Sequence, residues 1–80
     1  MQLTVLLFAS YADAFGAPQV AVSVDDGATV RDLLGRLAQL PGAERLPPAP
    51  LVAVNQRYAR ADQRLSPGDE VAVIPPVAGG

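Results

Sequence analysis

The sequence contains no cysteine, no histidine and no lysine. The absence of cysteine excludes disulfide bonds, thiolate metal sites and a thiol nucleophile. The absence of histidine removes the commonest general base and the commonest metal ligand. Without lysine, no side chain can accept an isopeptide bond, although the C-terminus can still be given to another protein. Thiol and imidazole chemistry are therefore excluded.

Charge and hydropathy narrow the possible partners. Six arginines stand against eight acidic residues, and the formal net charge of −2 argues against nucleic acid or an anionic membrane as a partner. No apolar run approaches the length of a membrane span, and the N-terminal residues lack the basic region and cleavage site of a signal peptide. With 80 residues, of which 50% are apolar, the sequence predicts one soluble cytoplasmic domain.

The first 24 residues predict two strands joined by a short helical segment. Residues 2–9 alternate with apolar side chains on both faces, and Leu6 and Phe8 share the second face. Such a strand is expected either in the middle of a sheet or under another protein. Residues 10–16 predict one or two helical turns that end at a glycine, and residues 19–24 predict a second strand with its valines on one face.

The main helix is predicted to begin after Thr29. This residue is a good N-cap, and Asp32 three positions later favours the positive end of the helix dipole. Pro41 and Gly42 are expected to stop the helix. Its apolar stripe, at helical spacing, consists of Val30, Leu33, Leu34, Leu37 and Ala38. A packed core is the expected role of this stripe, in preference to a cofactor groove.

The second half of the chain predicts short strands and turns. Four prolines within residues 41–50 indicate an irregular surface loop, and residues 66–69 carry proline and glycine at the positions typical of a type II turn. The remaining expected elements are a third strand at 51–54, a turn at 55–57, a brief pairing at 58–61 and a final strand at 70–74.

This order of elements predicts an α+β fold of the β-grasp, or ubiquitin-like, type. A mixed four- to five-stranded sheet would pack on one main helix, with the first and last strands parallel and adjacent in the middle. We expect one β-grasp domain over residues 1–76 and a flexible tail over residues 77–80. An extended C-terminus would then leave from a central strand.

The C-terminal stretch is the most informative part of the sequence. Pro75 and Pro76 come directly after the last strand, and since proline has no N–H and a fixed φ, they end the strand and stiffen the chain beyond them. Gly79 and Gly80 carry no Cβ, so this end of the backbone is thin enough to enter a narrow channel. The α-carboxylate of Gly80 is the one reactive group of the tail. The sequence therefore suggests a protein whose own C-terminus is a substrate.

The sequence resembles the family of small, sulfur-carrying subunits of molybdopterin synthase from end to end. The most specific part is the C-terminal run, a Gly-Asp-Glu-Val turn and strand followed by Pro-Pro and a terminal Gly-Gly. The segments that carry the resemblance are Val5-Leu6-Leu7-Phe8-Ala9, Thr29-Val30-Arg31-Asp32-Leu33, Val54-Asn55 and residues 68–80. Thiamine-pathway carriers share the Gly-Gly end but generally lack the Pro-Pro step.

The resemblance implies a carrier that is not catalytic on its own. An ATP-dependent activating enzyme would adenylate the Gly80 carboxylate, which is then converted to a thiocarboxylate. The tail, with Gly79 beside its end, would enter the active site of the large synthase subunit and give its sulfur to the pterin precursor. The implied assembly is a heterotetramer, and no cofactor or metal is expected on the carrier itself.

The resemblance also implies an interface with the large subunit. Its expected residues are Phe8, Leu6, Ile74, Pro75, Pro76, Val77 and Ala78. We predict that Leu6, Phe8 and Ile74 lie together on the sheet face away from the helix, because residues of one parity on adjacent strands share a face. The chain departs from the family at residues 11–13, where many members carry a basic residue, so partner ion pairs are not expected there.

Three other functions remain open at this stage. The chain can be a sulfur carrier for thiamine synthesis or tRNA thiolation, or a protein modifier whose Gly80 is joined to lysines of target proteins. It can also be an interaction module with no covalent chemistry. Detection of conjugates in cell extract would favour the modifier, and full function after extension of the C-terminus would favour the interaction module.

Overall fold

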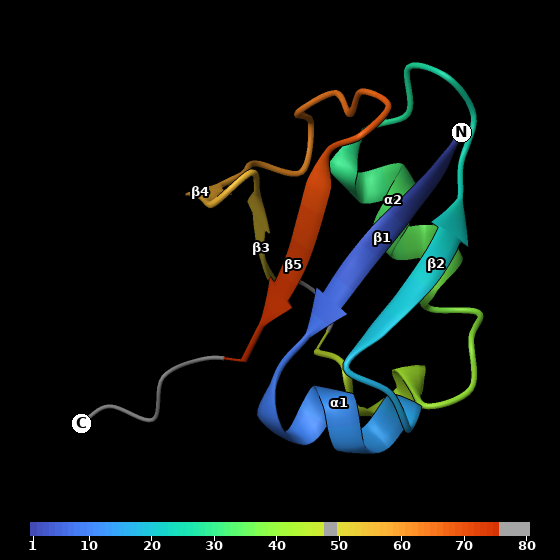
Figure 1. The fold of residues 1–80 in the computed structure, drawn as a ribbon, viewed down its shortest axis with the longest axis vertical. Coiled ribbons are helices and arrows are strands. Elements are labelled where there is room, and N and C mark those ends of the chain that lie inside the picture. Colours follow the sequence, from blue (N-terminus) through green and yellow to red (C-terminus); the bar gives the residue numbers. More distant parts are fainter. Residues whose placement is uncertain (48–49, 76–80) are drawn as a thin grey trace.

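The structure, a computed structural model, describes residues 1–47 and 50–75. Its centre is a five-stranded sheet with the strand order β2-β1-β5-β3-β4 (Figure 1). The strands are β1 (Gln2–Leu7), β2 (Gln19–Ser23), β3 (Leu51–Val54), β4 (Arg57–Tyr58) and β5 (Glu70–Ile74). Strands β1 and β5 are parallel and adjacent, and the other neighbouring pairs are antiparallel. This is the β-grasp architecture that the order of elements predicted.

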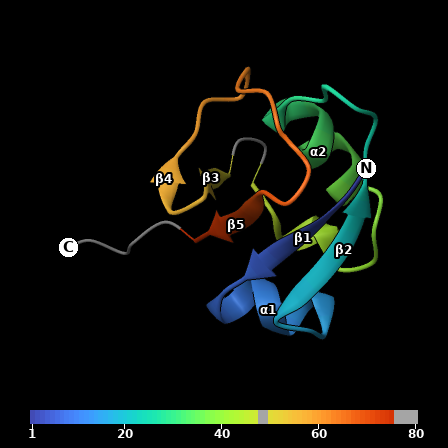
Figure 2. The ribbon, with the colours of Figure 1, turned by 45° about the horizontal axis from the view of Figure 1, so that its top comes forward.

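Two helices and one 3-10 helix complete the described fold. They are α1 (Ala9–Phe15), α2 (Val30–Leu37) and the 3-10 helix η1 (Ala43–Arg45). Helix α2 covers one face of the sheet, whereas α1 lies beyond the end of β1, in both views (Figures 1 and 2). No helix among residues 1–47 and 50–75 has both the length and the apolar character that crossing a membrane requires.

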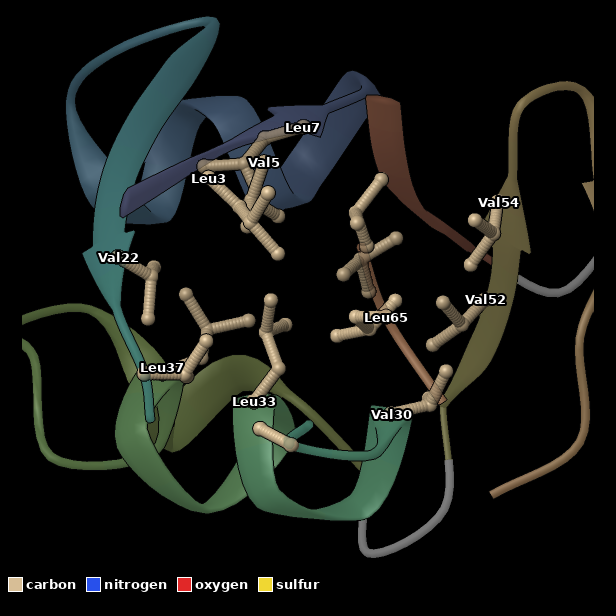
Figure 3. Close-up of a cluster of buried hydrophobic side chains, with 14 of the residues drawn as sticks. Leu3, Val5, Leu7, Val22, Val30, Leu33, Leu37, Val52, Val54 and Leu65 are labelled. Atoms are coloured by element: carbon tan, nitrogen blue, oxygen red, sulfur yellow. The ribbon is translucent and has the colours of Figure 1, made fainter. Parts of the chain in front are cut away.

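The core fills the layer between the sheet and α2 (Figure 3). Every second residue of β1 and β5 points into this layer, and Val5, Val71 and Val73 are fully buried there. From the other side, α2 contributes Leu33 and Leu37, which are also fully buried. Burial of each such side chain contributes about 1.5–3 kcal/mol. The odd-numbered positions of β1 therefore belong to the core, and its even-numbered positions remain for another surface.

The backbone N–H groups at the N-terminus of α2 are satisfied by hydrogen bonds to nearby residues. The Thr29 hydroxyl accepts a hydrogen bond from the Asp32 N–H at 3.3 Å, and the Thr29 N–H donates to the Asp32 carboxylate at 2.9 Å, which forms a capping box. The Thr29 backbone N–H, followed by the Thr29 hydroxyl contact, lowers the pKa of Asp32. The Val30 N–H donates to the Gln63 carbonyl oxygen at 2.9 Å. The predicted N-cap is confirmed, and the helix starts without unsatisfied donors at these positions.

The first helix corrects one predicted boundary. Strand β1 ends at Leu7 and not at Ala9, because Ala9 has a φ of 51° and turns the chain out of the strand directly after Phe8. Helix α1 begins at Ala9, one residue before the predicted segment, and ends at Phe15, where Gly16, with a φ of 74°, forms the predicted left-handed cap. Within α1, Tyr11 is part of the core.

Other boundaries differ for local reasons. Helix α2 ends at Leu37, before Pro41, because short-range hydrogen bonds such as Gln39 N–H to the Arg36 carbonyl tighten the chain there, and Ala38 is exposed. The predicted irregular loop contains the 3-10 helix η1.

The turn after β3 is also shorter than predicted. It consists of Asn55 and Gln56, both with positive φ, as a type I′ hairpin turn requires. Arg57 therefore pairs with Val54 in the sheet, and β4 covers residues 57–58 where the prediction was a pairing at 58–61.

Gly42 gives a test of the packing between α1 and η1. Its φ is 100°, and a Cβ there would lie 2.8 Å from the Ala14 carbonyl carbon and 2.9 Å from the Phe15 Cα. Left-handed strain costs roughly 1–2 kcal/mol, and the backbone clash adds to it. We expect Gly42→Ala to lower the free energy of unfolding by about 3 kcal/mol, measured by urea denaturation. Gly35→Ala is the control, because it is helical with open space around it, and it should raise stability by about 1 kcal/mol.

The turn before β5 is held by a polar network. The Asp69 N–H donates to the Ser66 carbonyl at 3.1 Å and Gly68 has a φ of 85°, as predicted for a type II turn. One Asp69 carboxylate oxygen accepts from the Ser66 N–H at 2.8 Å, and the other accepts from the Asn55 amide at 2.9 Å. Asn55 in turn accepts from the Glu70 N–H at 2.9 Å. This network joins the hairpin turn to the start of β5.

Acid should weaken this network. The Ser66 N–H, followed by the Asn55 amide, lowers the pKa of Asp69. Because the unfolded chain then binds the proton more readily than the folded one, the contribution of Asp69 is present above about pH 4 and is lost as pH falls through the folded pKa. We expect the unfolding midpoint to drop as the pH falls below about 4, and Asp69→Asn to reduce the size of this drop. An unchanged drop in Asp69→Asn would contradict the assignment, and the exposed Asp13→Asn serves as the control.

Candidate functional site

Strand β5 leads the chain from the middle of the sheet towards the C-terminus. It is hydrogen-bonded on both sides, with Val73 opposite Leu7 of β1 and Ile74 opposite Leu51 of β3. Pro75 comes next and is half-buried. The position from which the chain leaves the sheet is thus fixed by two neighbouring strands. The predicted functional residues Pro76, Val77, Ala78, Gly79 and Gly80 lie outside the described residues.

The face of the sheet opposite α2 is apolar and uncovered at several positions. The structure brings Leu6, Phe8 and Ile74 together there, as their parity predicted, around a shallow hollow of about 420 Å³. Phe8 is 46% exposed, whereas Leu6 and Ile74 are half-buried. We call this surface the outer face. Its apolar residues are Leu6, Phe8, Leu51, Ala53, Tyr58, Ala72 and Ile74.

The hollow exists because small residues lie between large ones. The register places Leu6 beside Ala72, Ala72 beside Ala53, and Ala53 beside Tyr58, across four neighbouring strands. The two alanines form a low floor, and the larger side chains at either end rise above it. The outer face is therefore concave and suited to accept a protruding apolar group of a partner.

Four residues of the outer face were not among the predicted interface residues. These residues are Leu51, Ala53, Tyr58 and Ala72. Leu51 is 47% exposed and Tyr58 is 74% exposed, so both present large apolar surface to solvent. The strand alternation at 51–54 could have shown that Leu51 lies on the sheet face away from the core. Tyr58 offered no such signal, because its strand has only two residues.

The proline-rich loop does not lie on the outer face where it is described. Pro50 lines a different hollow together with Leu34 of α2 and Ala38, the residue after that helix, on the other side of the sheet. Glu70 is the one charged residue among the described residues that line the outer hollow. No group of three or more metal-binding side chains occurs within residues 1–47 and 50–75. The outer face is therefore suited to bind an apolar surface of another molecule beside the end of β5.

Known proteins share this chain's sequence and fold over its whole length. The model of the ThiS family matches residues 5–80. The molybdopterin synthase sulfur carrier subunit of Chlamydomonas reinhardtii is 37% identical over 83 residues, which cover 100% of both chains. The crystal structure of SAMP1 from Haloferax volcanii has a TM-score of 0.85 and 32% identity, again over 100% of both chains.

The fold is also shared at lower identity. One chain of the protein–protein complex of subunits 1 and 2 of molybdopterin-converting factor from Helicobacter pylori has a TM-score of 0.74 at 21% identity, with 100% of both chains covered. That likeness concerns the fold alone. The sequence matches carry further, since they extend through the last strand to residue 80. The chain therefore belongs to the ThiS family, together with the sulfur-carrier subunits of molybdopterin synthase that it matches along its whole length.

Proposed function

We propose that this protein is the sulfur carrier of a molybdopterin synthase, with the Gly80 carboxylate as the group that carries the sulfur. The observation that carries the proposal is the end-to-end match with a sulfur carrier subunit, in a chain whose β5 leaves the sheet beside an exposed apolar face. In this proposal the carrier binds to the synthase, presents its C-terminus there, and is afterwards loaded with sulfur again. The carbon–sulfur chemistry takes place on the enzymes that receive it.

The proposed cycle begins with activation of the terminus. A Gly80 carboxylate oxygen attacks the α-phosphorus of ATP on an activating enzyme, pyrophosphate leaves, and an acyl-adenylate forms. Sulfide-level sulfur from a donor then attacks the acyl carbon, the C–O bond to AMP breaks, AMP leaves, and a thiocarboxylate forms without any change of oxidation state. In the synthase, that sulfur passes to the pterin precursor and water restores the carboxylate. ATP is consumed by the activating enzyme, and the carrier holds no cofactor.

The outer face is the proposed docking surface for the large subunit. Phe8, Leu51 and Tyr58 expose apolar area that a partner can bury, and Leu6 and Ile74 extend it towards the start of the tail. Aromatic side chains in such positions are typical energetic anchors of interfaces. Docking here would place the end of β5, and hence the chain beyond it, against the same partner.

Intact-mass measurement of the protein purified from its own host tests the proposal. A carrier in use should include a species heavier by the difference between one sulfur and one oxygen atom, and tandem mass spectrometry should place the change at Gly80. The sulfur species should disappear when the gene for the activating enzyme is deleted. A protein found only as the carboxylate, in cells that actively make molybdopterin, would refute the carrier function.

A protein modifier is the second candidate, and one observation favours it. The chain has 32% identity to SAMP1 over its full length, and the related Haloferax volcanii structure is described as a small archaeal modifier protein. In this case Gly80 would be joined to lysine side chains of other proteins. Immunoprecipitation under denaturing conditions separates the two candidates, since a modifier yields larger conjugates with a Gly-Gly remnant on target lysines. A carrier for another thiolation pathway would instead show the sulfur species without loss of molybdopterin on gene deletion.

A further inference from the structure

Every positively charged side chain of this protein is a guanidinium group. The six basic residues are all arginines, and each is exposed. They are Arg31, Arg36, Arg45, Arg57, Arg60 and Arg64. They occur on α2, on η1, on β4 and in the connection to β5, so arginine is not confined to one surface.

In the described part of the structure, these arginines make no interaction that requires a guanidinium group. None of their side chains donates a hydrogen bond within residues 1–47 and 50–75. The one ion pair they make in that part of the chain joins Arg60 Nε to an Asp62 carboxylate oxygen at 4.0 Å, with both side chains largely exposed. Such a pair contributes at most about 1 kcal/mol. A lysine would supply the same charge and solubility at these positions, because the planar fork that distinguishes arginine is unused.

The remaining primary amine of this chain is held against the sheet. The Met1 nitrogen donates a hydrogen bond to the Val24 carbonyl oxygen at 2.6 Å and lies 3.6 Å from an Asp26 carboxylate oxygen. The Met1 side chain is only 6% exposed. This nitrogen therefore lies at the start of β1, whereas β5, which runs parallel to β1, leaves the sheet at the opposite end.

We propose that this protein is an acyl donor that is protected against reaction with itself: its cationic surface carries no side-chain amine that could intercept the activated Gly80 carboxyl. The inference rests on the proposed function, in which that carboxyl becomes an acyl-adenylate. A neutral amine that attacks the acyl carbon forms a C–N bond, expels AMP as the C–O bond breaks, and gives its extra proton to solvent. The product is an amide, and the carrier is lost to sulfur transfer.

The size of this protection follows from the ordinary pKa values of lysine and arginine. At neutral pH the neutral fraction of a lysine exceeds that of an arginine by at least about a hundredfold, because the ordinary pKa of lysine, about 10.4, is at least about 2 units lower than that of arginine. An exposed lysine that comes within reach of the activated Gly80 carboxyl would therefore compete with the sulfur donor. Arginine keeps the charge and removes the nucleophile.

The test activates Gly80 without any enzyme. The full chain is prepared with a C-terminal thioester, as the unaltered protein, as Arg57→Lys and as Arg57→Gln, and each is incubated at pH 8. The unaltered chain and Arg57→Gln should give the hydrolysed acid and no amide on a side chain. Arg57→Lys should form an amide, as a linked dimer or a ring closed within one chain, at a rate on the order of a hundredfold higher. Thermal unfolding shows that the three chains are folded alike, as the exposure of Arg57 predicts.

Peptide mapping of the amide locates the attacking nitrogen. Amide formation by the unaltered chain at the rate of Arg57→Lys would overturn the inference, and so would hydrolysis of Arg57→Lys with no amide. Because the thioester is made without the activating enzyme or a sulfur donor, its fate does not depend on whether cells use this chain as a carrier. The intact-mass measurement decides the proposed function separately.

Discussion

Removal of Gly80 is expected to abolish sulfur transfer and leave the fold intact. The described sheet ends at Ile74, and the core residues all precede Pro75, so the deletion removes no described core contact. The new terminal carboxylate, on Gly79, would be displaced by up to about 3.6 Å along the chain. Since a misplacement of about 1 Å can already cost a factor of about 100, molybdopterin formation in a reconstituted assay should fall by more than that factor.

Two companion variants separate chemistry from folding. Extension of the chain by one alanine should abolish transfer as well, because it moves the carboxylate in the opposite direction. Gly79→Val keeps the length, but a β-branched side chain adds bulk next to the reacting carboxyl and disfavours positive φ. All three proteins should unfold at the temperature of the unaltered chain and still bind the large subunit through the outer face. A shortened chain that supports full molybdopterin formation would exclude Gly80 as the sulfur carrier.

The sequence predicts the core of this protein well because strand alternation and helical spacing are local properties. Val5 and Val71 lie in the interior as their parity requires, and Leu33 and Leu37 meet them from the helix. The parallel pairing of β1 and β5 follows from the order of the elements. The N-cap at Thr29 could also be predicted from residue types alone, whereas the return hydrogen bond to the Asp32 carboxylate is seen only in the structure.

The outer face could be predicted only in part. Its concavity depends on Ala53 and Ala72, which are far apart in sequence and become neighbours only through the register of β3 and β5. Tyr58 belongs to a strand too short to show alternation, and its place is set by the type I′ turn before it. Ala9 adopts a positive φ that nothing about alanine suggests, yet this conformation turns the chain out of the strand directly after Phe8. The roles of Pro76 to Gly80 stay predictions.

Phe8→Asp is expected to cost little stability and most of the affinity for the large subunit. Phe8 is 46% exposed and has an extended backbone, with φ −126° and ψ 151°, which aspartate adopts without strain. In the complex, however, the carboxylate of the substituted aspartate would be buried in an apolar contact without a partner charge. An aromatic anchor replaced in this way should lose at least about 3 kcal/mol of binding free energy, which raises Kd by more than about a hundredfold.

Titration calorimetry with the purified large subunit measures this loss directly. Gln39→Asp is the matched control, because it makes the same change in net charge at an exposed residue near α2, away from the outer face. Its Kd should stay close to that of the unaltered chain, since a distant surface charge is largely screened at physiological salt. Equal losses in both variants would show that net charge and not the outer face controls binding. Unchanged affinity in Phe8→Asp would place the interface elsewhere and leave the hollow around Ala53 and Ala72 without a role in docking.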